Sequence, residues 1–172
     1  MEKLRTPLLL MLCVIVVFST GTAFVRQMPK AQSPCDLIKK SVNNNTGEII
    51  YTSPPVGTKP RIIVQKDFVL NEPMYSLQMN AVGDSANLDA SGVTIIFEDG
   101  TVWTRKAALS LNVTDKGFFQ YTGSPMLIED DLPLFTTKKI KKYLLYTYSQ
   151  EVTPTEATQV QDYIKCIRDL KK

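Results

Sequence analysis

The sequence feature that most constrains the fold is the run GVTIIFEDGTVWTR at residues 92–105. Two β-branched and aromatic stretches flank Asp99-Gly100, a pair that readily takes the positive φ angles of a type I′ turn. The pattern predicts a tight antiparallel hairpin with strands at about 93–98 and 101–105. A chain built around such a hairpin is expected to form an antiparallel sheet.

Further strand patterns surround this hairpin. Residues 75–81 alternate strictly between apolar and polar side chains, which predicts a strand with one buried and one solvent-exposed face. Shorter β-branched or aromatic runs predict the remaining strands, at residues 49–51, 62–64, 118–122 and 140–149. The sheet is therefore expected to be mainly antiparallel.

Helix signals are confined to two places. The acids and the proline at the start of residues 129–137 suit the first turn of a short helix. Thr153-Pro154-Thr155-Glu156 supplies an N-cap, a proline and a capping glutamate ahead of a C-terminal amphipathic helix over about 154–170. Antiparallel strands with these two helices predict an α+β domain.

The first residues are typical of an export signal. A mildly basic start precedes an apolar run at residues 8–18, and Gly21 and Ala23 are the small residues that signal peptidase accepts. We expect residues 1–23 to be a signal peptide, 24–34 a polar tether and 35–172 one α+β domain. The alternative is that residues 6–25 stay in place as a membrane anchor. Export to the periplasm, the cell surface or the medium is expected in the first case.

Two cysteines remain beyond the expected cleavage site, Cys35 and Cys166. An even pair in an exported chain, one near each end of the domain, predicts a disulfide bond between the domain's start and its last helix. The alternative is two separate buried thiols.

The sequence lacks residues and motifs that several kinds of catalysis and ligand binding require. The chain has no histidine, which removes histidine-dependent catalysis and histidine metal sites. It has no phosphate-cradling glycine motif, so we expect no cofactor. A net charge of +3 over 172 residues does not indicate nucleic-acid binding, and membrane contact is expected only through an uncleaved N-terminal segment.

Carboxylates are the remaining candidates for acid–base chemistry, but no spacing singles out a catalytic pair. The densest group is Glu129–Asp131. We interpret it as an acidic helix start, since the alternating oxygen ligands of a calcium loop are absent.

Four aromatic residues form a candidate binding patch: Trp103, Tyr143, Tyr146 and Tyr148. In a two-residue hairpin turn, Trp103 would face Ile96 on a half-polar strand face, where an exposed ring could recognise a glycan or a peptide. The alternative is that Trp103 packs beneath the terminal helix as part of the core.

The order of motifs over residues 90–172 resembles small, uncharacterised exported proteins of Bacteroidetes-type bacteria. The similar features are the Asp-Gly hairpin, the acidic helix start IEDDLPLF, the strand KKIKKYLLYTYS and the cysteine-bearing final helix. The resemblance implies an exported location and no particular activity.

The sequence thus favours an exported cell-envelope or surface module that binds a protein or a glycan without catalysis. The alternatives are an exported hydrolase that relies on carboxylates, and a structural subunit anchored by its N-terminus. An enzyme is expected to bring carboxylates together in a cleft, whereas a binding module is expected to expose an aromatic or apolar surface.

Overall fold

The computed structural model describes residues 32–57, 61–69 and 72–171. The expected signal peptide (1–23), the alternative anchor (6–25) and the tether up to residue 31 lie outside the described residues. In chain order the elements are the 3₁₀ helix η1 (Pro34–Leu37), β1 (Lys39–Val42), β2 (Ile49–Thr52), β3 (Ile62–Val69), β4 (Glu72–Gly83), β5 (Ser91–Phe97), β6 (Val102–Val113), β7 (Phe119–Gly123), β8 (Met126–Leu127), the 3₁₀ helix η2 (Glu129–Asp131), α1 (Leu132–Thr137), β9 (Ile140–Leu145), β10 (Tyr148–Glu151) and α2 (Pro154–Asp169).

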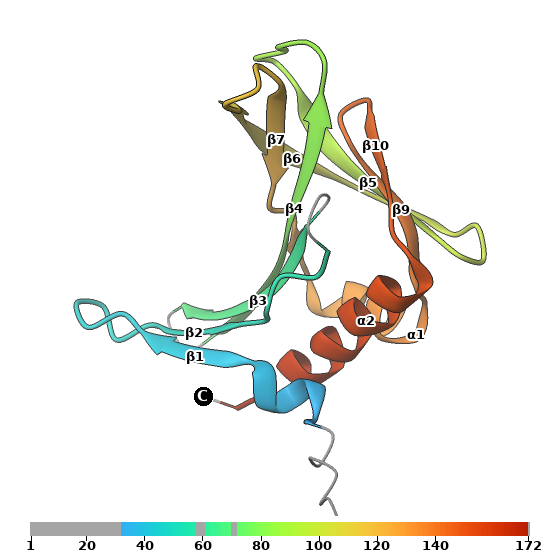
Figure 1. Cartoon of the computed structure of the whole chain (residues 1–172). Helices are drawn as coiled ribbons and strands as arrows, with labels where there is room; N and C mark the ends of the chain where they lie inside the picture. Colours follow the sequence, from blue (N-terminus) through green and yellow to red (C-terminus); the bar gives the residue numbers. More distant parts are fainter. Residues whose placement is uncertain (1–31, 58–60, 70–71, 172) are drawn as a thin grey trace, which may run out of the picture. The chain divides into compact units, whose positions relative to one another are not determined.

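The described strands form one sheet in the order β1-β2-β3-β4-β7-β6-β5-β9-β10, and β8 pairs with β4 (Figure 1). Neighbouring strands are antiparallel throughout these pairings. This confirms an α+β domain dominated by an antiparallel sheet. A short helix near 129–137 is present as η2 followed by α1, and a C-terminal helix follows β10.

Two long strands, β4 and β6, each pair with different neighbours along their length and so connect β1–β3 to β5, β9 and β10 through β7. The first half of β4 pairs with β3, and its second half pairs with β7. Likewise, β6 pairs with β5 along its first half and with β7 along its second. Because both strands are shared in this way, the sheet curls, and the β9–β10 hairpin comes to lie beside β4 (Figure 1).

Tyrosine side chains fill the junction between this hairpin and β4. The Tyr143 hydroxyl donates to the Asn80 carbonyl at 2.6 Å, and the Tyr148 ring stacks on Tyr121 with centroids 4.8 Å apart. A Cβ atom at Gly83 would lie 2.5 Å from the Tyr148 ring. Glycine at this position therefore lets the two strands approach with a tyrosine between them.

The central hairpin forms, but its turn differs from the expected type I′. Gly100 has a φ of 83°, whereas Asp99 keeps a negative φ. The Phe97 N–H donates to the Thr101 carbonyl at 2.9 Å, and Trp103 pairs with Ile95 rather than with Ile96. A one-residue change of register moves a side chain to the other face of the sheet. Trp103 consequently shares the buried face of Ile95.

The prediction of one strand over residues 140–149 is wrong, because the chain reverses inside it. Leu145 pairs with Tyr148 across a two-residue turn, and Tyr146 takes a φ of 57° there. Its N–H donates to the Gly92 carbonyl at 3.0 Å, which holds the turn against the start of β5. No Gly or Asn marks this reversal in the sequence.

The C-terminal helix α2 begins with the expected capping box, in which Thr153 and Glu156 cap each other's backbone N–H groups. It packs on β3, η1 and α1. Its buried residues are Ala157, Val160, Gln161, Tyr163, Ile164 and Ile167.

The end of α2 is held in three ways. The predicted disulfide bond is present between Cys35, in η1, and Cys166, with Cα atoms 5.2 Å apart. The buried Lys66 donates to the Arg168 and Leu170 carbonyls, at 3.1 and 2.5 Å, and the Tyr51 hydroxyl donates to the Lys171 carbonyl. Burial lowers the pKa of Lys66 from its ordinary value, although Asp169 opposes that effect.

Candidate functional site

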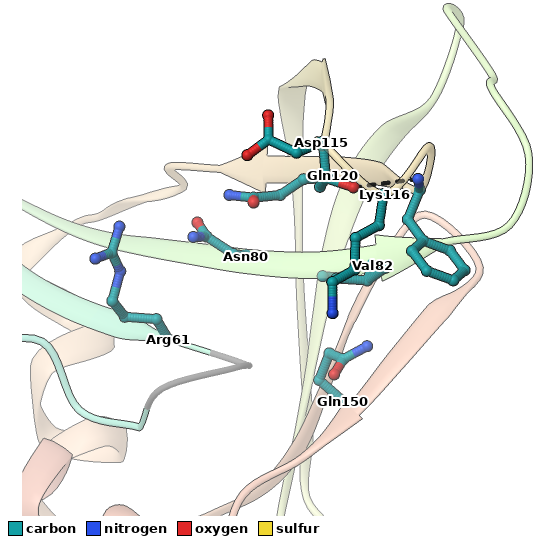
Figure 2. Close-up of a pocket in the computed structure, with 10 residues that line it drawn as sticks. Arg61, Asn80, Val82, Asp115, Lys116, Gln120 and Gln150 are labelled. Atoms are coloured by element: carbon teal, nitrogen blue, oxygen red, sulfur yellow. Dashed lines mark hydrogen bonds between the residues drawn. The ribbon is translucent and has the colours of Figure 1, made fainter.

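A surface cleft of about 670 Å³ lies over the second half of β4 (Figure 2). It is formed by β4, the position just before β3, the β6–β7 turn, β7 and β10. Seven of its side chains are polar and three are apolar. The lining residues are Arg61, Asn80, Ala81, Val82, Thr114, Asp115, Lys116, Phe118, Gln120 and Gln150.

The alternation of β4 supplies the floor of the cleft. Met79 and Ala81 point into the core, so Asn80 and Val82 point to the opposite face. Across the ladder, Val82 pairs with Gln120 of β7, which places a second amide beside the first. The Thr122 hydroxyl donates to the Asn80 side-chain oxygen at 3.3 Å, and this leaves the Asn80 NH₂ group to donate to a ligand.

The β6–β7 turn builds one wall. The Phe118 N–H donates to the Thr114 hydroxyl at 3.1 Å, and the Thr114 N–H donates to the Phe118 carbonyl at 2.8 Å. Gly117 completes the turn with a φ of 77°. This geometry places Asp115 and Lys116 at the tip and leaves the Phe118 residue 51% exposed.

Charges lie at separate places in the cleft. Figure 2 shows Arg61 at one end and Lys116 at the other, with the amides of Asn80 and Gln120 between them. Within the described residues, the ion pairs involve none of the charged groups that line the cleft. The cleft thus offers two cations, one carboxylate and three primary amides for contact with a ligand.

The four aromatic residues singled out from the sequence do not form one exposed surface. Trp103 and Tyr143 are buried, Tyr148 is half-buried against Tyr121, and Tyr146 is 43% exposed in the β9–β10 turn. Trp103 packs edge-on against Phe135 of α1, with centroids 5.2 Å apart. It therefore lies in the core, beneath the short helix rather than beneath the terminal one.

Asp131 of the acidic stretch has a defined structural role. Its carboxylate accepts from Trp103 Nε1 at 2.9 Å, from Arg105 at 2.6 Å and from the Ile128 N–H at 3.0 Å. Burial acts to raise the pKa of Asp131, but the bonds from Arg105, Trp103 and Ile128 outweigh it and the pKa falls below its ordinary value. Glu129 and Asp130 are exposed beside it.

In the part of the chain that the structure describes, no three Cys, Asp or Glu side chains come close enough together to hold a metal ion. The oxygens of Asp131 are already engaged by their three donors.

Among the described helices, none is long and apolar enough to cross a membrane. No protein family, no curated protein and no solved structure matches this chain.

Sequence reasoning missed the cleft. Its residues come from the position just before β3, from β4, the β6–β7 turn, β7 and β10, and the strand pairing that brings them together is not visible in the chain order. One local signal was available. The turn sequence Thr114-Asp115-Lys116-Gly117 places the following Phe118 at a loop boundary, where an aromatic ring is poorly covered.

Proposed function

We propose that this protein is an exported cell-envelope or surface module that binds a glycan in the cleft over β4 without catalysing a reaction. The observation that carries the proposal is the lining of the cleft: primary amides beside an exposed aromatic ring. Amide groups both donate to and accept from sugar hydroxyls. An aromatic face such as that of Phe118 packs against the apolar face of a sugar ring.

The number of carboxylates in the cleft favours glycan binding over glycan hydrolysis. Glycoside hydrolysis needs two carboxyl groups about 5–10 Å apart, flanking the bond that breaks. Within the described residues, the lining of this cleft contains one, Asp115. A protein partner is the second candidate ligand, but extended peptides usually bind through a strand edge and apolar side-chain pockets, and most of this lining is polar.

The exported location in this proposal rests on the sequence. Residues 1–23 have the pattern of a signal peptide, and the resemblance over residues 90–172 is to exported proteins of Bacteroidetes-type bacteria. In Figure 1, η1 lies at the far end of the domain from the β6–β7 turn. A domain joined to a surface near η1 would hold that turn away from the attachment point.

Export predicts that the protein from its natural host begins at Phe24. The reason is that Gly21 and Ala23 follow directly on the apolar run and suit signal peptidase. N-terminal sequencing of the purified native protein measures this. An intact N-terminus in the membrane fraction would instead support the anchored structural subunit with residues 6–25 as its anchor.

Glycan binding predicts that Phe118→Ala weakens the affinity about 3- to 10-fold, the usual effect of one aromatic contact. The measurement is titration calorimetry of the domain with a panel of neutral and acidic polysaccharides. At least one of them is expected to bind, and prolonged incubation is expected to release no new reducing ends.

Leu88→Ala is the matched control, since Leu88 is an apolar residue that is 86% exposed and lies outside the lining. It is expected to leave the affinity unchanged. Failure of every polysaccharide to bind contradicts the proposal, and release of reducing ends supports the hydrolase alternative.

A further inference from the structure

We infer that the glycan bound in this cleft is acidic, with carboxylate groups that contact Arg61 and Lys116. This inference rests on the proposed glycan-binding function and adds the class of ligand. It follows from the balance of donors, acceptors and charges in the lining.

The cleft is rich in hydrogen-bond donors. Arg61 and Lys116 can only donate, and the oxygen of the Asn80 amide already accepts one hydrogen bond from the Thr122 hydroxyl. Within the described residues, the hydrogen bonds do not engage the side-chain amides of Gln120 and Gln150. A ligand that carries carboxylates, which only accept hydrogen bonds, therefore fits this lining better than a neutral sugar, in which every hydroxyl also donates.

The two cations come from different parts of the cleft, Arg61 from just before β3 and Lys116 from the β6–β7 turn, and Figure 2 draws the amides of Asn80 and Gln120 between them. A ligand with repeated charges suits this arrangement. A polyuronate carries a carboxylate on sugar rings at regular intervals along its chain. Such a chain would pair with Arg61 and Lys116 while its hydroxyls contact the amides between them.

Asp115 provides an internal test, because its carboxylate is the one feature of the lining that opposes an anion. It is exposed at the tip of the β6–β7 turn, next to Lys116. If the ligand is acidic, removing this charge strengthens binding. If the ligand is neutral, the same change is without effect or removes a hydrogen-bond acceptor that the ligand uses.

The experiment measures the affinity of the domain for three polyuronates: polygalacturonate, alginate and hyaluronate. Methyl-esterified polygalacturonate, which has the same sugar without the charge, is the neutral comparison. We expect at least one polyuronate to bind more tightly than the ester, and its affinity to fall as salt is raised. Arg61→Gln and Lys116→Gln are each expected to weaken binding about 2- to 5-fold, the effect of one exposed ion pair.

Asp115→Asn is expected to strengthen binding by a similar factor of about 2 to 5. Lys106→Gln is the control for net charge, because Lys106 is exposed on β6 and lies outside the cleft. Its affinity is expected to match that of the unchanged protein.

Each other outcome has a distinct meaning. If the ester and neutral polysaccharides bind as tightly as the polyuronates and Phe118→Ala weakens them all, glycan binding stands and the acidic preference is wrong. If poly-L-glutamate binds as tightly as the best polyuronate, the ligand class is an acidic peptide and the inference is overturned. If no polysaccharide binds, both the inference and the proposed function fail.

Discussion

Replacing both Cys35 and Cys166 by serine is expected to lower the free energy of unfolding by about 3–5 kcal/mol. The bond joins residues 131 apart, and closing a loop of that length removes much of the entropy of the unfolded chain. Urea unfolding of the two proteins, followed by circular dichroism, measures the difference. The double replacement avoids a lone thiol that would form disulfide-linked dimers.

Reductant provides the control for this prediction. Reducing the unchanged protein should reproduce the loss, and the double serine variant should not respond to reductant. The folded structure near Cys166 is expected to persist in the variant, because Lys66 and Tyr51 still bond the last carbonyls of the chain. An unchanged free energy of unfolding would show that the unfolded chain is already compact around these two positions.

The second large effect is expected at Asp131. Asp131→Ala removes three hydrogen bonds and leaves Arg105 without its partner, so we expect a loss of about 2–4 kcal/mol. One Arg105 nitrogen, Nε, is already buried without a hydrogen-bond partner, which makes the site sensitive to losing another contact. Thermal or urea unfolding gives the measurement.

Asp130→Ala is the matched control, since Asp130 is the exposed neighbour in the same 3₁₀ helix. It is expected to change stability by less than about 0.5 kcal/mol. Equal effects at the two positions would mean that the charge of the helix start matters more than the contacts of Asp131.

The pH dependence follows from the lowered pKa of Asp131. A carboxylate whose pKa is lower in the folded than in the unfolded protein stabilises the fold at pH values above its unfolded pKa. That contribution is lost as the pH falls through the folded pKa. The unchanged protein is therefore expected to lose stability below about pH 4 more steeply than Asp131→Ala, which lacks this group.

Local sequence patterns were enough to predict much of the fold. The alternation of residues 75–81, the capping box at Thr153 and Glu156, and the Asp99-Gly100 pair each act within a few residues. Their elements all form. The disulfide bond was predicted because only two cysteines remained beyond the expected signal peptide.

The errors arose where distant contacts decide the conformation. In the hairpin, the Asp99 carboxylate accepts from the nearby Thr101 N–H at 3.0 Å, and the distant Lys138, at the end of α1, forms an ion pair with the same carboxylate. The bond from Lys138 is the main reason that the pKa of Asp99 falls to about 2. The turn at Tyr146 is likewise held by Gly92, more than fifty residues earlier.

The position of α2 sets the order in which the molecule can fold. This helix covers β3 and is bonded to η1, both of which come from the first 70 residues of the chain. Until α2 has been synthesised, the face of β3 that this helix covers lacks that partner. Folding that depends on such distant partners is slow compared with local helix formation. The domain should therefore become cooperative only once α2 has been synthesised, which leaves the new chain open to chaperones until then.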